Sequence, residues 1–272
     1  MPTLPHVKIG NLSVSKLIVG GNPFSGISHQ SNEADEKMID YYTADRIKKV
    51  LAECERLCIN TWIGRCDNFV VRVLREYRNE GGRIQWIAQS APERKSLLDN
   101  IRMAKARGAD AFFVQGGHTE LIAQGEWTWD GLAEAVKLIR DLGMPAGAAT
   151  HSPTFHAERL DRGITLDFAC QSLYRVAGRM GKIEQHVDTN ELFVHEDRVA
   201  ALEAIARIPE PTIAYKVLGA GRYEPRDSFK QLGQYLKPKD AVLIGIYNEH
   251  KANMVAEDIA LTTEYLKPGC AV

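Results

Sequence analysis

The feature that most constrains the fold is an alternation of short apolar runs with longer segments of helical periodicity, repeated along the chain. The apolar runs are residues 17–20, 59–63, 84–88, 111–115, 145–149, 168–171, 212–217 and 242–246. Short apolar runs joined by helical stretches are typical of parallel strands with crossover helices. Two examples of the latter are 43–57, opened by the helix-capping residue Thr43, and 98–106, followed by Gly108. The pattern predicts an α/β fold, specifically a (β/α)8 TIM barrel.

The length agrees with one such barrel. A single (β/α)8 barrel takes about 250 residues, and this chain has 272, so we expect one domain over 1–272. Two segments are long for barrel loops, 22–42 after the first strand and 175–195 after the sixth. Loops of this size are often functional lids. We expect both to lie over the barrel mouth and to close on a polar substrate.

The net charge of the chain and its N-terminal residues indicate what kind of partner the protein binds and where in the cell it is found. The chain carries 34 basic and 35 acidic residues, a formal net charge of −1, which gives no electrostatic footprint for nucleic acid or an anionic membrane. The partner is therefore expected to be a small molecule. No basic segment followed by an apolar stretch opens the chain, and no apolar run approaches the ~20 residues of a membrane span. We predict a cytoplasmic protein.

The cysteines give no sign of a disulfide framework. Their number is odd, and the chain is large: Cys54, Cys58, Cys66, Cys170 and Cys270. Cys54 and Cys58 have a spacing that a metal could use, but no second cysteine pair lies near them in the sequence. We expect reduced thiols, mostly buried as small apolar residues.

Candidate site residues follow from the predicted fold, because TIM barrels carry their chemistry at the C-terminal ends of the strands. The strand ends rich in amides and other hydrogen-bonding groups suit a hydroxylated ligand. The predicted substrate-binding residues are Asn22, Trp62, Arg65, Gln89, Gln115, Gln171 and Asn248. The predicted catalytic residues are His118, His151 and Lys216. Two of the binding residues have a structural alternative, since Arg65 could pair with Asp67 and Trp62 could simply pack.

Among the predicted catalytic residues, Lys216 has the most specific chemical role. A lysine pointing into a barrel mouth beside Tyr215 could have a lowered pKa and act as a base or form a Schiff base. The structural alternative is an ion pair inside the barrel with Asp67 or Glu120. His118 and His151 could act as acid and base, could bind a divalent metal together with Glu120, or could be structural histidines.

Both ends of the chain resemble the aldo-keto reductases. Residues 7–15 look like that family's N-terminal hairpin, which plugs the barrel bottom before strand one. Residues 213–221, Ile-Ala-Tyr-Lys-Val-Leu-Gly-Ala-Gly, are similar to its seventh strand and the glycine turn that follows. The resemblance extends from Val7 to about Leu261. It implies a barrel with a hairpin plug and, as one alternative, an NAD or NADP site. That site would use Gln171, Tyr215, Gly219, Gly221, Arg222 and Lys251.

The departures from that family concern its chemistry. The family reduces carbonyls with an aspartate, a lysine, a tyrosine and a histidine. Here neither the aspartate nor the tyrosine is in register after strand two, and Gln89 replaces the lysine that lowers the tyrosine's pKa. Gln115 stands in the histidine register, with His118 in the loop beyond. The resemblance therefore implies a divergent member without the catalytic tetrad.

Three functions remain open from the sequence. The favoured one is a carbohydrate-metabolism enzyme that performs non-redox isomerisation, epimerisation or elimination on a polyhydroxylated or phosphorylated substrate. The second is a divergent NAD(P)(H)-dependent oxidoreductase, which Tyr215, Gln171 and the glycine turn favour. The third is a catalytically inactive ligand-binding barrel, which the missing tetrad favours. A divalent metal and a nicotinamide dinucleotide are the cofactors considered.

Overall fold

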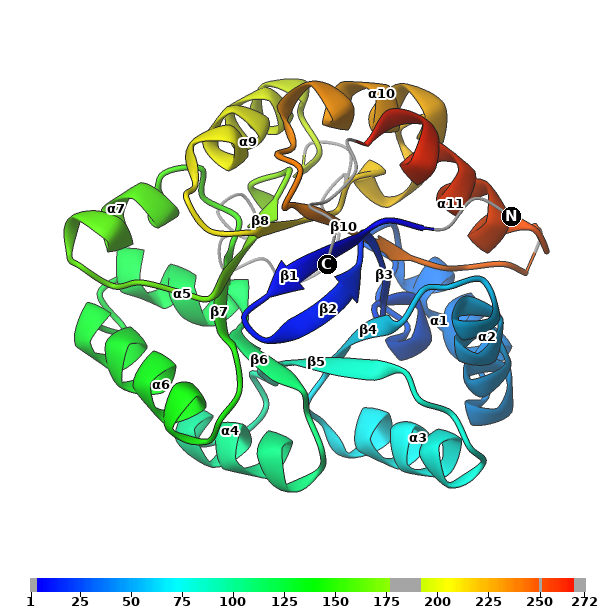
Figure 1. Ribbon diagram of the computed structural model, residues 1–272, viewed down its shortest axis with the longest axis horizontal. Coiled ribbons are helices and arrows are strands. Elements are labelled where there is room, and N and C mark those ends of the chain that lie inside the picture. The colour runs from blue at the N-terminus through cyan, green and yellow to red at the C-terminus, as the bar shows by residue number, and fades with distance from the viewer. Residues whose placement is uncertain (1–3, 177–191, 250, 267–272) are drawn as a thin grey trace.

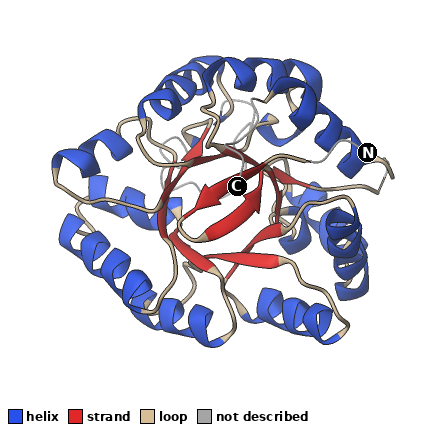
Figure 2. Cartoon of the chain, in the orientation of Figure 1, coloured by secondary structure: helices blue, strands red, loops and turns tan. Residues whose placement is uncertain are grey.

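A closed barrel of eight parallel strands forms the centre of the computed structural model, which describes residues 4–176, 192–249 and 251–266. Helices surround the barrel as an outer ring (Figures 1 and 2). The strands are β3 (Leu17–Gly20), β4 (Thr61–Arg65), β5 (Gln85–Gln89), β6 (Ala111–Val114), β7 (Ala146–Thr150), β8 (Phe168–Ser172), β9 (Thr212–Tyr215) and β10 (Ala241–Gly245). Each predicted apolar run overlaps one of these strands, with boundaries that differ by at most two residues. The (β/α)8 TIM-barrel prediction is confirmed.

The strands pair in sequence order, and the last pairs with the first. β10 lies beside β3 with Val242 opposite Leu17 and Gly245 opposite Gly20. Parallel pairing throughout brings all the strand C-termini to one end of the barrel. We call that end the barrel mouth and the opposite end the bottom.

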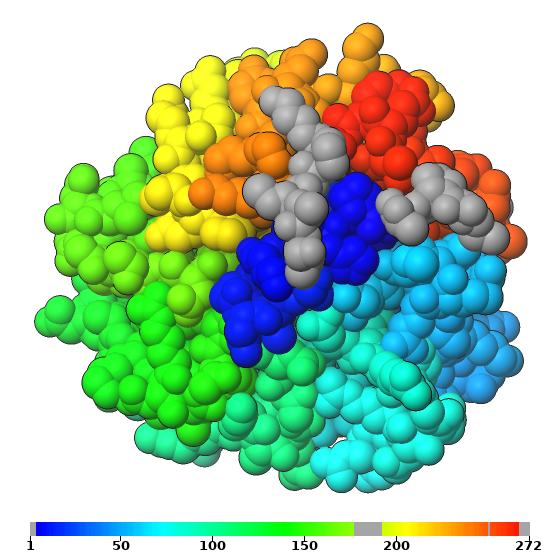
Figure 3. All heavy atoms as spheres, in the orientation of Figure 1, coloured from blue at the N-terminus to red at the C-terminus, as the bar shows by residue number. Residues whose placement is uncertain are grey.

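The N-terminal hairpin seals the bottom, as predicted. Strand β1 (His6–Ile9) pairs antiparallel with β2 (Leu12–Ser15), and the two cross the bottom face of the barrel (Figures 1 and 3). Gly10 makes the tight turn with φ +56°, a left-handed conformation that glycine adopts without steric cost. Val7, Ile9 and Val14 are buried in the same cluster as the inward side chains of the barrel strands. Burial of these apolar side chains holds the hairpin in place.

The helices cover the outside of the barrel. They are α1 (Asn32–Tyr41), α2 (Ala44–Arg56), α3 (Asn68–Asn79), α4 (Leu97–Ala106), α5 (Gly116–Ala123), α6 (Trp129–Asp141), α7 (Phe155–Asp161), α9 (His195–Arg207), α10 (Pro225–Tyr235) and α11 (Met254–Tyr265), with short 3-10 turns η1 (Pro23–Ser25) and η3 (Gly219–Gly221). Thr43 caps α2 by accepting a hydrogen bond from the Arg46 amide, as the sequence predicted. The predicted helix 98–106 corresponds to α4.

Alternation along the strands divides the core into two layers. Inward residues such as Ile63, Ile87 and Phe113 fill the barrel together with the hairpin. Outward residues such as Trp62 and Trp86 pack between the barrel and the helices. A side chain at a strand end therefore reaches the mouth only if its position has the inward phase of that alternation.

The segment 22–42, predicted as a long loop over the mouth, has secondary structure of its own. It contains η1 and the ten-residue helix α1, which Ser31 caps and which carries Glu33 and Asp35 in its first turn. Helix α1 buries no residue. Its sequence therefore lacks the apolar periodicity by which helices are recognised. Of the other predicted loop, 175–195, residues 177–191 lie outside the described part of the chain.

Two further observations concern the cysteines and the helices. Cys54, Cys66 and Cys170 are buried and Cys58 is exposed, and all four are free thiols. Among the described residues, no helix has the length and apolar character needed to cross a bilayer.

Candidate functional site

Lys216, immediately after β9, has the most unusual environment at the mouth. Its backbone is left-handed with φ +58°. In a residue with a side chain, this conformation costs on the order of 1–3 kcal/mol and persists only where the surrounding structure imposes it. The side chain is largely buried, and its Nζ lies 2.5 Å from Nε2 of His29. The ion pair considered for Lys216, with Asp67 or Glu120, is not formed.

His29 approaches Lys216 from the segment between η1 and α1. Its own backbone is also left-handed, with φ +56°, and its Nε2 lies 3.3 Å from Nδ2 of Asn22. The Ser28 amide donates to Asp35 Oδ1 at 2.7 Å, and Gln30 Nε2 donates to the Ala220 carbonyl at 2.8 Å. These bonds fix the segment on both sides of the imidazole. We therefore assign His29 to the site.

Sequence reasoning missed His29. Residues 28–33 form a polar run, and nothing in its local pattern marks one histidine as part of a buried contact. Residue 29 and residue 216 are 187 positions apart. The only local hint was the polar Asn22 at the end of β3, which the sequence did identify and which contacts the imidazole.

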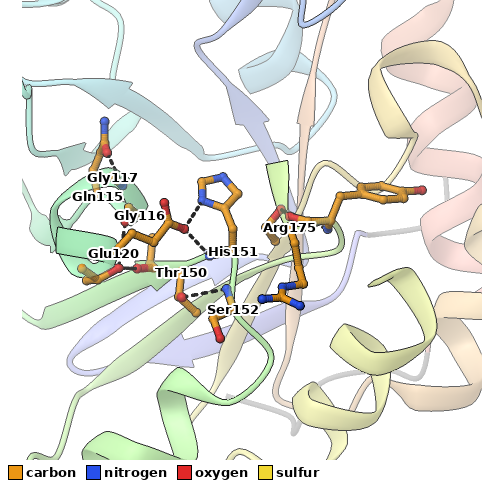
Figure 4. Close-up of polar contacts among 12 residues, drawn as sticks. Gln115, Gly116, Gly117, Glu120, Thr150, His151, Ser152 and Arg175 are labelled. Carbon is orange, nitrogen blue, oxygen red and sulfur yellow. Dashed lines mark hydrogen bonds and ion pairs between the residues drawn. The ribbon is translucent and has the colours of Figure 1, made fainter. Parts of the chain in front are cut away.

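A histidine–carboxylate pair lies two strands away from β9, with His151 at the end of β7 and Glu120 on α5. Glu120 Oε1 lies 2.6 Å from Nδ1 of His151 and accepts the His151 backbone amide at 3.1 Å. Figure 4 shows the carboxylate directed at both nitrogens. Because a carboxylate accepts hydrogen bonds, it favours the proton on Nδ1 and leaves Nε2 as the basic atom. This is the arrangement that a general acid–base histidine uses.

The local framework explains why the sequence has glycine at 116. A Cβ on Gly116 would lie 2.9 Å from the His151 ring and 3.3 Å from Tyr215 Oη. Tyr215 donates its hydroxyl to the Thr150 carbonyl at 3.0 Å, and its ring stands edge-on to His151 at 5.6 Å between centroids. The glycine therefore permits the close approach of α5, His151 and Tyr215.

The electrostatics of this group follow from burial. Burial lowers the pKa of Lys216 to about 7, although the Glu120 carboxylate opposes the shift. Burial also lowers the pKa of His29 well below 6.5, aided by the charges of Lys216, His151 and Arg222. The pKa of His151 is lowered by burial and partly restored by Glu120. Near neutral pH the site thus contains an amine and two imidazoles that can each be uncharged.

His118 lies apart from this group. It is on α5, where its Nδ1 lies 3.5 Å from Ser90 Oγ and its ring stands 6.1 Å from that of Trp127. Burial lowers its pKa. In the stretches 4–176, 192–249 and 251–266, no three histidine, cysteine, aspartate or glutamate side chains are arranged to hold a metal ion. The geometry thus gives no support to a metal site formed by His118, Glu120 and His151.

Several predicted binding residues have structural partners. Arg65 pairs with Asp67 at 3.5 Å and with Glu93, so its structural alternative is the one observed. Gln115 caps α5 through Oε1, which accepts the Gly117 amide at 2.6 Å. Asn248 Oδ1 accepts the hydroxyls of Tyr41 and Tyr42 at 3.2 and 3.3 Å. Gln89 ends β5 in the inward phase and stays half-buried. Their contacts with a substrate remain predictions.

Trp62 and Gln171 have the outward phase of their strands. Trp62 is 1% exposed and packs in the layer between barrel and helices, where its Nε1 meets no hydrogen-bond partner from the described residues. Gln171 is fully buried, and its Nε2 donates to the Ser172 carbonyl at 2.9 Å, while Oε1 has no partner in the same part of the chain. Strand ends alone predicted both residues, but the alternation directs their side chains away from the lumen.

The residues expected to hold a dinucleotide do not fit it well. The Tyr215 ring packs against His151, and the turn Gly219–Gly221 is contacted by the protein's own Gln30. Arg222 lies over the Phe193 ring at 4.4 Å. Lys251 is exposed and forms an ion pair with Glu257. The phosphate-binding positions and the stacking surface thus already have intramolecular partners.

A pocket of about 460 Å³ opens beside the mouth, between η1, α1 and the end of β4. Its lining residues are Phe24, Ser25, Ile27, Ile39, Tyr42, Arg65, Asp67 and Phe69. The segment between Asn22 and His29 thus contributes residues to this pocket as well as to the contact with Lys216. The pocket is large enough for a small organic group.

Comparison with known proteins gives a match at the level of the fold. No family model matches the chain, and no curated protein matches it. A solved structure from Pseudomonas aeruginosa described as a “putative aldo-keto reductase” is 17% identical, with a TM-score of 0.65 over 97% of this chain and 98% of that one. A second structure with that description, 17% identical, gives 0.61 over 95% and 96%.

A different barrel enzyme also matches. The truncated 3-deoxy-D-arabino-heptulosonate 7-phosphate synthase from Thermotoga maritima is 11% identical, with a TM-score of 0.54 over 97% of this chain and 91% of that one. At these identities the matches speak for the fold alone. The chain has a TIM-barrel fold similar to that of aldo-keto reductase structures, as the resemblance of its two ends predicted.

Proposed function

We propose that this protein is an enzyme for non-redox chemistry at the carbonyl of a small polyhydroxylated or phosphorylated molecule, with isomerisation, epimerisation or elimination as the reaction class. The observation that carries the proposal is the Lys216 amine, buried at the mouth beside an imidazole, with no carboxylate partner among the described residues and with its pKa lowered to about 7. A neutral amine is the form that attacks a carbonyl or accepts a proton.

The second element is the acid–base pair of His151 and Glu120, at the end of β7 and on α5. Carbon–hydrogen bonds next to a carbonyl, or next to the iminium that a lysine forms from it, lose a proton to a suitably placed base. His151, oriented by Glu120 at 2.6 Å, is a base of this kind. We assign Lys216 to carbonyl activation and His151 to proton transfer at the neighbouring carbon.

The substrate class is supported by the surroundings of these groups. Asn22 and Gln89 offer hydrogen bonds to hydroxyl groups. A match to an enzyme named for a sugar-phosphate product is consistent with this class at the level of fold. These features favour a polar carbonyl compound over an apolar one.

The test is reductive trapping. Purified protein is incubated with dihydroxyacetone phosphate, glyceraldehyde or pyruvate and with cyanoborohydride, and the modified peptide is identified by mass spectrometry. We expect a stable adduct on Lys216, its loss in Lys216→Met, and its retention in Lys105→Met, which removes an exposed lysine of α4. Proton exchange into the same compounds in D2O should depend on His151. Labelling spread evenly over surface lysines would contradict the proposal.

The second candidate is a nicotinamide oxidoreductase, which the likeness of the fold to that of aldo-keto reductase structures favours. It predicts fluorescence quenching and thermal stabilisation on addition of NADPH or NADH. A catalytically inactive binding barrel predicts instead tight ligand binding without turnover, unchanged in Lys216→Ala. Titration with both dinucleotides, alongside trapping, separates the three functions.

A further inference from the structure

His29 and Lys216 form a contact between two groups that are both cations when protonated. Their nitrogens are 2.5 Å apart in a largely buried place. Two positive charges at this separation would repel strongly because little water is present to screen them. The pair therefore holds at most one positive charge, and a proton on one nitrogen excludes a proton on the other.

Both residues are held in this contact by their backbones. The left-handed φ values of +56° for His29 and +58° for Lys216 turn each side chain toward the other from separate segments. The His29 carbonyl accepts a hydrogen bond from Arg222 at 3.5 Å, and the flanking Gln30 is tied to the η3 turn. Strained backbone on both sides of a polar contact is typical of functional sites.

The orientation of the imidazole follows from its neighbours. Asn22 Nδ2 and Lys216 Nζ both point at Nε2. Both are hydrogen-bond donors, so Nε2 acts as an acceptor and the proton of the neutral ring sits on Nδ1. An unprotonated ring nitrogen next to an amine is placed to receive its proton.

We propose that His29 is the catalytic base that takes a proton from the Lys216 ammonium so that Nζ can attack a substrate carbonyl. This inference rests on the proposed function. The Nζ–H bond breaks and its proton moves to Nε2, the nitrogen lone pair bonds to the carbonyl carbon, and the carbonyl π electrons move to oxygen. The oxygen then receives two protons, one returned by His29 and one from nitrogen, and leaves as water. The ammonium and the carbonyl compound thus become a protonated imine and water.

The charged groups around the pair agree with this role. Arg222 and His151 face His29 and disfavour its protonated form, so the proton is held only transiently. Glu120 faces Lys216 and favours the ammonium there. The proton therefore rests on the amine and moves to the imidazole as the amine reacts.

The experiment is chemical rescue in the full-length protein. Glycine fits the left-handed backbone at 29, and His29→Gly leaves room for free imidazole. We expect the rate of cyanoborohydride trapping of glyceraldehyde on Lys216 at pH 7 to fall about 10²-fold in His29→Gly, the usual scale for loss of a general base. Added imidazole should restore most of it. In His6→Gly, which removes a histidine from the hairpin at the bottom of the barrel, the rate should stay within about twofold of wild type.

A second readout does not depend on imine formation. The pKa of the His29 ring, followed by NMR, should rise in Lys216→Met because the neighbouring positive charge is one cause of its lowering. Trapping at the wild-type rate in His29→Gly, or a slow rate that imidazole leaves unchanged, would overturn the role of His29. Absence of trapping in the wild type would overturn the proposed function. The NMR shift in Lys216→Met would then still decide whether the two residues are coupled, and an unchanged pKa would remove the basis of this inference.

Discussion

The two ends of the barrel each contain a buried lysine, and the two amines have different hydrogen-bond partners. At the bottom, Lys16 is fully buried, and its Nζ donates to the Pro238 carbonyl at 2.7 Å. At the mouth, Lys216 meets an imidazole in left-handed backbone. A carbonyl oxygen satisfies an ammonium, whereas an imidazole competes with it for the proton. The Pro238 carbonyl stabilises the ammonium of Lys16. The surroundings of Lys216 lower its pKa, so that its amine is only partly protonated near pH 7.

The same contrast holds for backbone conformation. At the bottom, the turn of the hairpin places Gly10 in the left-handed region, where glycine carries no Cβ penalty. At the mouth, His29, Lys216 and Ala220 occupy that region with side chains. Cys58 (φ +69°), in the loop between α2 and β4 at the bottom, is a further residue of this kind, so among the described residues this strain is more frequent at the mouth but is not confined to it.

The largest expected effect is on stability when the amine at the mouth is removed. The folded pKa of Lys216 is about 7 against an ordinary 10.5, so the penalty of burying its charge is full below pH 7 and disappears as pH rises toward 10.5. Lys216→Met should therefore be more stable than wild type at pH 7, by a few kcal/mol at about 1.4 kcal/mol per pKa unit. Urea unfolding at pH 7 and pH 10 checks this, and the gap should narrow at pH 10. An equal gap at both pH values would contradict the assignment.

The next effect concerns the carboxylate partner of His151. Glu120→Gln keeps the shape of the side chain but removes the charge that raises the pKa of His151. We expect that pKa to fall further and proton exchange into a trapped substrate to slow by about 10²-fold. NMR titration of the imidazole and deuterium incorporation measure the two effects. A change in exchange without any change in the histidine titration would point to a role other than the one assigned.

Lys16→Met should act in the opposite direction to the same substitution at the mouth. It removes the hydrogen bond from the ammonium to the Pro238 carbonyl, and a hydrogen bond to a charged group contributes about 1.5–3 kcal/mol. Urea unfolding at pH 7 should show the loss, with trapping on Lys216 unchanged. If both lysine variants shifted stability in the same direction, the contrast between the two ends of the barrel would be lost.

The smallest effect should come from relaxing the turn after β9. Ala220 has φ +53°, so Ala220→Gly removes a Cβ clash and should stabilise the fold by about 0.5–1 kcal/mol. The Ala220 carbonyl that accepts Gln30 is retained. Thermal unfolding measures the change. Gly10→Ala is the matching test at the bottom, where a Cβ would lie 2.7 Å from Pro145 and should destabilise the protein.

Part of the site could be read from the chain. The end of β9 identified Lys216, and the end of β7 identified His151, because polar residues there follow immediately on apolar strands. The same rule also selected Gln171 and Trp62, whose side chains point outward from the barrel because of the alternation along their strands. It selected Gln115 too, which caps a helix. It omitted His29, which stands beyond a 3-10 turn that follows β3. Strand ends thus indicate where a site is but not which side chains point into it.

The barrel could be predicted from the order of residues along the chain, because eight apolar runs separated by crossover segments can bury their surface together in few ways. The hairpin plug could be predicted as well, from the resemblance of residues 7–15, and its buried Val7, Ile9 and Val14 match the apolar interior. The contacts of His29 with Lys216 and of Glu120 with His151 form only when the barrel folds. These pairs join residues 187 and 31 positions apart. Their proton affinities arise from burial and from neighbours that the folded barrel brings together.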